Sequence, residues 1–253
     1  MSIVTIATDF GTADGYVAAV KGVIKSIAPD SELIDVTHDL DSIVKSSLVI
    51  IRYYSLYPTG TVHLMVVDPT VGSDRKALIG HDGNYYYVGP DNGIFSRIIA
   101  ACPDLRWWII DQTKVKQGEI SATFHGRDIF APAAAMIAKG ISPDKIGKRI
   151  KNPISLELPE PKSIENGIEG EIIDIDKFGN LIANISGEMI RGDVTIFPGE
   201  KESLSLVKTY SDVPQGKPLA YIGSLGYLEI GVNSGRADNY FRASIGDKVR
   251  VVV

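Results

Sequence analysis

The sequence HLMVVDPTVGSDR, residues 63–75, constrains the fold more than any other stretch of this chain. Residues 61–67 form a near-continuous apolar run, which is typical of a strand buried on both faces of a sheet. The run ends at Asp68 and Pro69, because proline cannot extend the hydrogen-bond ladder of a strand. A carboxylate is therefore expected at the carboxyl end of a buried strand, where open α/β sheets bind their ligands. Taken alone, Asp68 could equally cap a loop, and Arg75 could form a surface ion pair.

The first half of the chain alternates short apolar runs with helical patterns, which predicts an α/β domain with a mostly parallel central sheet. Residues 3–7 predict a strand, and a helical pattern begins at Asp14. Asp9 follows that first strand and could accept hydrogen bonds from both hydroxyls of a ribose, as acidic residues do in dinucleotide sites. Capping of the following turn is the equal alternative for Asp9. The loop has no Gly-rich dinucleotide fingerprint and no phosphate-loop motif, so we do not expect it to grip phosphates.

The segment TFHGRD, residues 123–128, precedes a predicted helix over residues 129–139. His125 at the entrance of this helix is well placed to handle a proton, and Gly126 permits a ligand to approach closely. Asp128 is predicted to cap the helix. A purely structural role is the alternative of equal weight for His125.

The chain changes character after residue 150. Prolines at 153, 159 and 161, interspersed with Glu and Ser, predict a linker over residues 153–166 between a domain at 1–152 and a domain at 167–253. Helical patterns nearly vanish beyond this linker. The short strands predicted there favour an all-β barrel or sandwich.

Two loops of the second domain carry candidate binding residues. In the sequence DKFGN, residues 176–180, Phe178 could offer a stacking face, and the amide of Asn180 matches the N6/N7 edge of adenine. A β-bulge with Phe178 in the core is the alternative. The sequence GSLGYLE, residues 223–229, is interpreted as a second polar, Gly-rich loop.

Composition excludes several classes of protein. A net charge of −5 argues against nucleic-acid binding, which favours a basic face. The single cysteine, Cys102, excludes an intrachain disulfide and a cysteine-based zinc site. No apolar run approaches the roughly 20 residues of a membrane span. The first residues lack the pattern of a signal peptide, so the sequence predicts a cytoplasmic protein without membrane partners.

Six segments in order give the chain a family resemblance over nearly its whole length: ATDFGTADGY, VVDPTVGSDR, GPDNGIF, TFHGRDIFAPAAA, DKFGNLIANI and GSLGYLEIGVN. Together they resemble the S-adenosylmethionine (SAM) hydroxide adenosyltransferases, which are related to the fluorinase and chlorinase enzymes. The resemblance implies an N-terminal α/β domain and a C-terminal β-barrel domain. It further implies a homotrimer, with each ligand held where the first domain of one subunit meets the barrel of its neighbour.

The resemblance also implies roles for individual residues. Asp68, Arg75 and His125 match a trio that activates water, and Asp9 matches an aspartate that binds the ribose. The remaining expected substrate contacts lie in the second domain, around the purine (Asp176, Phe178 and Asn180) and at the methionine end (Ser224 and, as a looser match, Glu229). Leu225 departs from the halogenases, which have a polar residue at this place.

The implied reaction is hydrolysis of SAM at ribose C5′, giving adenosine and L-methionine without a cofactor or metal. The halogenases carry a tyrosine where this chain has Asp68, and an anionic carboxylate would repel a halide but suits water. The alternatives are a chlorinase-like halogenase and a non-catalytic adenosine- or SAM-binding protein. A metal-dependent hydrolase is a further alternative, suggested by acidic loops at Asp9, Asp14, Asp39 and Asp68. The sequence lacks close ligand pairs such as His-x-His, which argues against it.

Overall fold

The fold is that of a computed structural model, which describes residues 2–199 and 202–253. The chain divides into two compact units, Met1–Leu156 and Glu157–Val253. Each unit has its own hydrophobic core, so each is described by itself. No helix of the described residues is long and apolar enough to cross a membrane.

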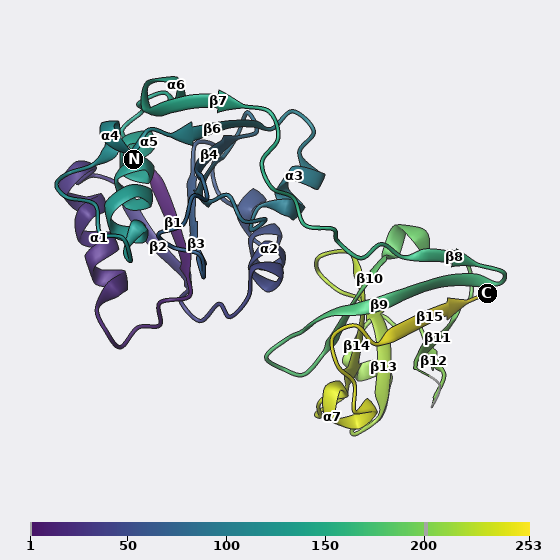
Figure 1. The fold of residues 1–253 in the computed structure, drawn as a ribbon. Coiled ribbons are helices and arrows are strands. Elements are labelled where there is room, and N and C mark those ends of the chain that lie inside the picture. Colours follow the sequence, from purple (N-terminus) through teal and green to yellow (C-terminus); the bar gives the residue numbers. More distant parts are fainter. Residues whose placement is uncertain (1, 200–201) are drawn as a thin grey trace. The chain divides into compact units, whose positions relative to one another are not determined.

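The first unit is built on a seven-stranded sheet in the order β2-β1-β3-β5-β4-β6-β7 (Figure 1). The four strands β2, β1, β3 and β5 run parallel, and β4, β6 and β7 add antiparallel partners at one side. Because the hairpin joining β4 and β5 carries Asp82-Gly83-Asn84, its tight turn was predictable from the sequence. The strands are β1 Ile3–Thr8, β2 Glu32–Thr37, β3 Val62–Val66, β4 Ala77–His81, β5 Tyr86–Pro90, β6 Arg106–Ile110 and β7 Gly147–Ile150.

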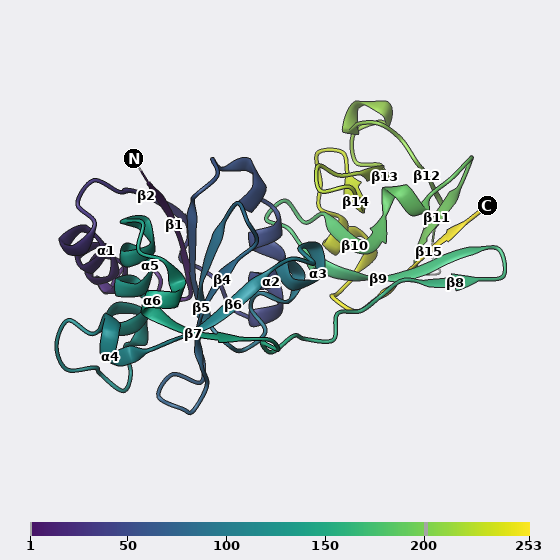
Figure 2. The same ribbon diagram turned by 90° about the horizontal axis from the view of Figure 1, so that it is seen from above.

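Helices cover both faces of this sheet, as Figures 1 and 2 show: α1 and α5 lie on one side, and α2 and α3 on the other. The two faces form two cores, because alternate residues of β3 point in opposite directions: Leu64 packs with α1 and α5, and Met65 with the opposite layer. The helical segments are α1 Tyr16–Ile27, α2 Ile43–Ile51, η1 Tyr54–Leu56, α3 Ser96–Ala101, α4 Gln112–Val115, η2 Gly126–Phe130, α5 Ala131–Ala138 and α6 Pro143–Ile146.

The second unit is an antiparallel sheet that nearly closes into a barrel, in the order β12-β11-β15-β9-β10-β14-β13, with β8 beside β9. A bridge between Leu206 and Ala220 joins its two ends. Its strands are β8 Lys162–Ile164, β9 Gly167–Ile175, β10 Leu181–Ser186, β11 Thr195–Pro198, β12 Leu204–Ser205, β13 Pro218–Ile222, β14 Tyr227–Val232 and β15 Lys248–Val252, with short helices η3 Gly187–Met189, η4 Tyr210–Asp212 and α7 Ala237–Phe241. The predicted fold class, α/β followed by an all-β barrel-like domain, is confirmed.

Three local predictions need correction or detail. Asp128 does not cap a helix, because it lies inside the π-helical turn η2 that precedes α5. The segment read as one polar loop over 223–229 is a tight turn followed by the start of β14, so Glu229 is a strand residue. Within the predicted linker, the amide of Ile154 donates to Asp91 of the first unit at 2.7 Å, and residues 162–164 pair with β9.

Candidate functional site

Two carboxylates emerge side by side at one edge of the first sheet. Strands β1 and β3 are parallel neighbours with Thr8 opposite Val66, and Asp9 and Asp68 follow close behind their ends. The amide of Asp9 donates to the carbonyl of Val66 at 3.3 Å, and the amide of Asp68 donates to Oδ2 of Asp9 at 3.4 Å. The pairing of two buried strands thus brings together residues that are 59 positions apart.

The loop after β3 folds back and pairs Asp68 with Arg75. Two successive turns reverse the chain. The amide of Val71 donates to the carbonyl of Asp68, and the amide of Ser73 donates to the carbonyl of Thr70. Nε of Arg75 lies 3.0 Å from Oδ1 and 2.9 Å from Oδ2 of Asp68, and Nη2 also donates to Oδ2. Both side chains are almost fully buried, 5% exposed for Asp68 and 6% for Arg75. Such a multidentate ion pair fixes the position of each partner.

His125 joins this pair from a separate part of the chain. It directly precedes the π-helical turn η2, an irregularity that is frequent at functional sites. Nη2 of Arg75 lies 2.9 Å from Nδ1 of His125, and the guanidinium stacks over the Phe130 ring at 5.0 Å. Asp68, Arg75 and His125 therefore form one connected cluster, as expected for a trio remote in sequence.

The contact with Arg75 sets the tautomer of His125. A guanidinium has no lone pair to share, so Nδ1 must accept the hydrogen bond and the ring proton of neutral His125 sits on Nε2. Burial lowers the pKa of His125, and the positive charge of Arg75 lowers it further, against the opposing influence of Asp68 and Asp128. His125 consequently offers a neutral ring with an N–H donor at neutral pH.

Asp68 and His125 border a cavity of about 590 Å³. It is lined by Asp9, Phe10, Tyr16, Val66, Asp68, Val71, Ser121, Thr123, Phe124, His125, Gly126 and Arg127. Three of the lining rings pack edge to face, with Tyr16 and Phe124 having centroids 5.2 Å apart. Desolvation in the cavity raises the pKa of the Asp9 carboxyl. The sequence analysis missed this aromatic cluster, although Phe10 and Tyr16 flank Asp9 in the same motif.

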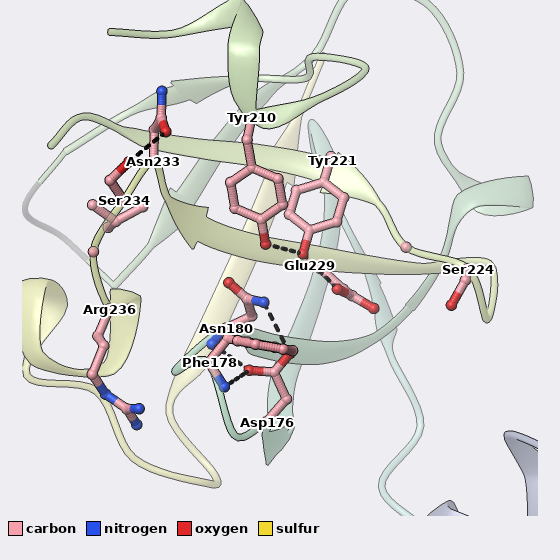
Figure 3. Close-up of a pocket in the computed structure, with 13 residues that line it drawn as sticks. Asp176, Phe178, Asn180, Tyr210, Tyr221, Ser224, Glu229, Asn233, Ser234 and Arg236 are labelled. Atoms are coloured by element: carbon pink, nitrogen blue, oxygen red, sulfur yellow. Dashed lines mark hydrogen bonds between the residues drawn. The ribbon is translucent and has the colours of Figure 1, made fainter. Parts of the chain in front are cut away.

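A second cavity, of about 770 Å³, lies in the second unit and is shown in Figure 3. One of its borders is the loop that connects β9 and β10. Oδ1 of Asp176 accepts the amides of Phe178 and Asn180, both at 2.9 Å, and Oδ2 accepts the side-chain amide of Asn180 at 2.9 Å. Asp176 thereby shapes the loop, and it leaves the Phe178 ring 73% exposed. The alternative of a core Phe178 is wrong, because the ring is largely exposed.

The same cavity is lined by the other two expected binding residues, Ser224 and Glu229, which are labelled in Figure 3. Glu229 lies directly opposite Tyr221 in the β13–β14 pairing, and Tyr221 donates to its Oε2 at 2.7 Å. The sequence analysis missed Tyr210, Tyr221, Asn233, Ser234 and Arg236, which line the cavity as well. A hairpin with a three-residue loop over 224–226 pairs Gly223 with Tyr227 and so sets Tyr221 opposite Glu229, because the register follows from the loop length.

The predicted site residues thus form two groups, one in each unit. Asp9, Asp68, Arg75 and His125 come together in the first unit, and Asp176, Phe178, Asn180, Ser224 and Glu229 surround one cavity in the second. Among residues 2–199 and 202–253, no three His, Cys, Asp or Glu side chains are placed to hold a metal ion.

An α/β domain with a buried ion pair at the carboxyl ends of its parallel strands, followed by a barrel domain with its own cavity, has the architecture of a small-molecule enzyme. The chain belongs to the SAM hydroxide adenosyltransferase family. The model of that family's N-terminal domain matches residues 4–147, and the model of its C-terminal domain matches residues 170–250. The resemblance inferred from the six sequence segments is confirmed.

Several relatives resemble the chain over most or all of its length. It is 35% identical, over 100% of both chains, to a Thermus thermophilus protein named (R)-S-adenosyl-L-methionine hydrolase. A fluorinase from an Actinoplanes species is 26% identical over 92% of this chain and 91% of its own. The crystal structure of an uncharacterised conserved protein from Thermotoga maritima superposes with a TM-score of 0.92 at 32% identity, covering 99% of this chain and 100% of that one.

Proposed function

We propose that this chain hydrolyses S-adenosyl-L-methionine at ribose C5′, giving adenosine and L-methionine. The observation that carries the proposal is the buried Asp68–Arg75–His125 cluster on a cavity that also holds Asp9. The names of the hydrolase relatives support the same reaction.

The leaving group explains why so few residues suffice. When the C5′–S bond breaks, its electron pair goes to sulfur, and the positively charged sulfonium leaves as a neutral thioether. No general acid and no metal is then needed to absorb negative charge. What remains is to hold an oxygen nucleophile in line behind C5′, and such positioning alone can lower a barrier by about 7–11 kcal/mol.

The cluster is suited to hold hydroxide. Arg75 brings a buried positive charge, and the proton on Nε2 makes His125 a donor toward an oxygen in the cavity. The Asp68 carboxylate accepts hydrogen bonds from Arg75 and Thr70, so in this proposal it orients the guanidinium and does not take the proton. The water proton goes to solvent as hydroxide binds, and a lone pair of hydroxide forms the C5′–O bond.

The proposal divides substrate recognition between the two cavities. Asp9 binds the ribose hydroxyls, with its carboxylate on the same cavity as Asp68. In the barrel domain, Phe178 stacks on the purine and Asn180 reads its edge, while Asp176 holds both in place. Ser224 lies at the methionine end, and a direct contact of Glu229 with the substrate stays a prediction.

The proposal also includes a homotrimer in which the barrel of one subunit completes the site on the first domain of the next. It rests on the family resemblance. A cytoplasmic location and independence of cofactors and metals stay predictions too.

The test is to incubate the purified protein with SAM in water enriched in oxygen-18 and to identify the products. We expect adenosine and methionine, with the label in the 5′-hydroxyl of adenosine and none in methionine. Label in methionine, or no turnover with adenosine bound, would refute hydrolysis at C5′. The second outcome would identify a non-catalytic binding protein.

The same assay separates the remaining alternatives. In the presence of chloride, formation of 5′-chloro-5′-deoxyadenosine would identify a halogenase. The chain has Asp68 where the halogenases have a tyrosine, and this difference favours the hydrolase. Loss of activity in a strong chelator, restored by a divalent metal, would identify a metal-dependent hydrolase.

A further inference from the structure

A row of three hydrogen-bonded side chains lies along one wall of the barrel-domain cavity (Figure 3). Tyr221 donates its hydroxyl proton to Oε2 of Glu229 at 2.7 Å, and the hydroxyls of Tyr210 and Tyr221 are 2.7 Å apart. All three residues line the cavity. The proposed function uses neither tyrosine of this row.

The direction of the row is fixed by Glu229. A carboxylate carries no donor, so the single proton of Tyr221 is committed to Glu229. The short contact between the two hydroxyls then requires Tyr210 to donate to Tyr221. The proton of Tyr210 thus points along the row, and only the lone pairs of its oxygen remain for a ligand. Burial and the neighbouring Glu229 raise the pKa of Tyr221, which keeps it protonated.

A second acceptor faces the same corner of the cavity. The side-chain nitrogen of Asn180 donates to Asp176, which fixes the amide orientation and leaves Oδ1 on the other side. A Cβ built on Gly231 would lie 3.0 Å from Oδ1 of Asn180 and 3.1 Å from the Tyr210 hydroxyl. Both acceptors therefore lie against the same glycine and border the same corner of the cavity.

We infer that the Tyr210–Tyr221–Glu229 row, with Asn180, selects a 6-aminopurine over a 6-oxopurine. An exocyclic amine brings two N–H donors to this corner, and the corner offers two acceptors. A 6-oxo group would place a third acceptor against them and leave all of them unpaired, which is costly in a desolvated site. Glu229 acts through the two tyrosines as a specificity-determining residue. The inference deepens the proposed function and rests on the purine of SAM occupying this cavity.

Binding of adenosine and of inosine, which differ at position 6 of the purine, tests the inference by calorimetry. Wild type should bind adenosine at least about tenfold more tightly than inosine, since one unpaired buried polar group suffices for that ratio. In Glu229→Gln the amide can donate to Tyr221, so the row can reverse and Tyr210 can donate into the cavity. We expect the preference for adenosine to shrink to about threefold or less.

Tyr221→Phe provides an independent variant, because it frees the proton of Tyr210 and should narrow the preference in the same way. Tyr240→Phe is the matched control. Tyr240 donates to Glu202 at 3.0 Å in the same domain, and it is not among the residues that line this cavity, so its removal should leave the ratio at the wild-type value. A wild-type ratio in both Glu229→Gln and Tyr221→Phe would overturn the inference.

Gly231→Ala tests the corner itself. The added methyl group should displace the two acceptors, Asn180 Oδ1 and the Tyr210 hydroxyl. Adenosine binding should weaken at least about tenfold, whereas binding of purine riboside, which carries only hydrogen at position 6, should be spared. Equal losses for both ligands would contradict the placement of the amine. The proposed function is tested separately: it is wrong if the wild-type protein neither hydrolyses SAM nor binds adenosine. A protein that hydrolyses SAM without preferring adenosine to inosine would refute the inference alone.

Discussion

Nη2 of Arg75 donates a hydrogen bond to Nδ1 of His125 over 2.9 Å, and this contact links two loops that are 50 positions apart. It orients the imidazole, fixes its tautomer and places a positive charge against it. Because Arg75 is also held by Asp68, the direction of the imidazole depends on the ion pair. The three residues should consequently behave as a unit.

Substitutions within this unit should lower turnover far more than affinity. We expect Arg75→Lys, Asp68→Asn and His125→Ala each to reduce kcat about 10²–10³-fold, the loss typical of one preorganised electrostatic group. Lysine does not rescue Arg75, because it lacks the fork that contacts Asp68 and His125 together. Adenosine affinity, measured by calorimetry, should change only a few-fold.

Asp9→Ala is the contrasting variant for this experiment. Since Asp9 is proposed to bind the ribose, its loss should weaken adenosine binding first. If Asp9→Ala left adenosine affinity unchanged, the ribose assignment would be wrong. Equal losses of turnover and affinity in the Asp68 and His125 variants would argue against their catalytic roles.

The titration of His125 should be displaced toward acid. Burial and the Arg75 charge lower its pKa, so the ring should stay neutral at pH 7 and gain a proton only below its ordinary value of about 6.5. Asp68 and Asp128 oppose this shift. Asp128→Asn removes one opposing charge and should lower the pKa of His125 further.

Nuclear magnetic resonance of nitrogen-15-labelled histidine measures this titration directly, and kcat/KM against pH provides the functional counterpart. The amide of Ser121 donates to Asp128 at 2.9 Å, and the side-chain oxygen that remains in Asp128→Asn can accept the same hydrogen bond. A His125 titration at or above pH 6.5, or an upward shift in Asp128→Asn, would contradict the electrostatic account.

The positions of Asp9 and Asp68 could be predicted from the sequence, because the strand pattern determines where side chains leave the sheet. The apolar run before Asp68 and the strand before Asp9 predict two buried strands, and parallel strands place their carboxyl ends at a common edge. His125 could not be placed by this argument. Its contact with Arg75 depends on the packing of η2, and a π-helical turn has no recognised signal in the sequence.

The barrel domain was harder to interpret for a different reason. Glycines at 223 and 226 favour a loop, and they masked the strand that begins at Tyr227. Its partner strand fixes Tyr221 opposite Glu229. Tyr210 contacts Tyr221 from η4, and this tertiary contact has no sequence pattern. Phe178 was ambiguous because an aromatic ring in a bulge suits either a core or a ligand.

Gly72 should be essential for joining the loop that carries Asp68 and Arg75 to the loop that carries His125. It has φ of +84°, and a Cβ there would lie 2.7 Å from the carbonyl oxygen of Ala122, close to His125 in the chain. Gly72→Ala should therefore displace one loop from the other and reduce kcat at least about tenfold, since misplacement by about 1 Å can cost far more.

Gly60→Ala is the matched control, since Gly60 has a similar φ of +90° and nothing within 4 Å of its Cβ position. Both variants bear the strain of alanine at positive φ, about 1 kcal/mol or more in unfolding free energy. Only Gly72→Ala should lose turnover, when kcat and urea unfolding are measured in parallel. Equal kcat in the two variants would show that the close contact is unimportant.

His63 should make the first unit sensitive to acid. It lies fully buried on β3, 2.8 Å from the Thr5 hydroxyl, with the Tyr87 ring stacked on it. Burial lowers its pKa to about 4. Between about pH 6.5 and 4 the unfolded chain binds a proton that the folded chain does not, so stability falls as pH falls.

The expected loss between pH 7 and pH 5 is about 2 kcal/mol in unfolding free energy, at 1.36 kcal/mol per pKa unit. Urea unfolding at the two pH values measures it. His63→Phe keeps a ring in the aromatic cluster and removes the titrating group. It should start from a lower stability, because Thr5 loses its partner, and should lose about 2 kcal/mol less on acidification than wild type. The same acid loss in the variant as in wild type would exclude His63 as its source.

Mixed oligomers can test where a complete site forms. If the barrel of one subunit completes the site of the next, a chain with Asp68→Asn and a chain with Phe178→Ala and Asn180→Ala should complement each other. Random co-assembly in a cyclic trimer pairs two intact halves at about one site in four, so co-expression should restore about a quarter of wild-type activity. Co-expressing Asp68→Asn with His125→Ala is the control. Both defects lie in the first unit, so no subunit contributes an intact first domain and no complete site can form. Activity that stays at the level of the separate variants, in material whose mass is that of a trimer, would mean that each chain builds its site alone.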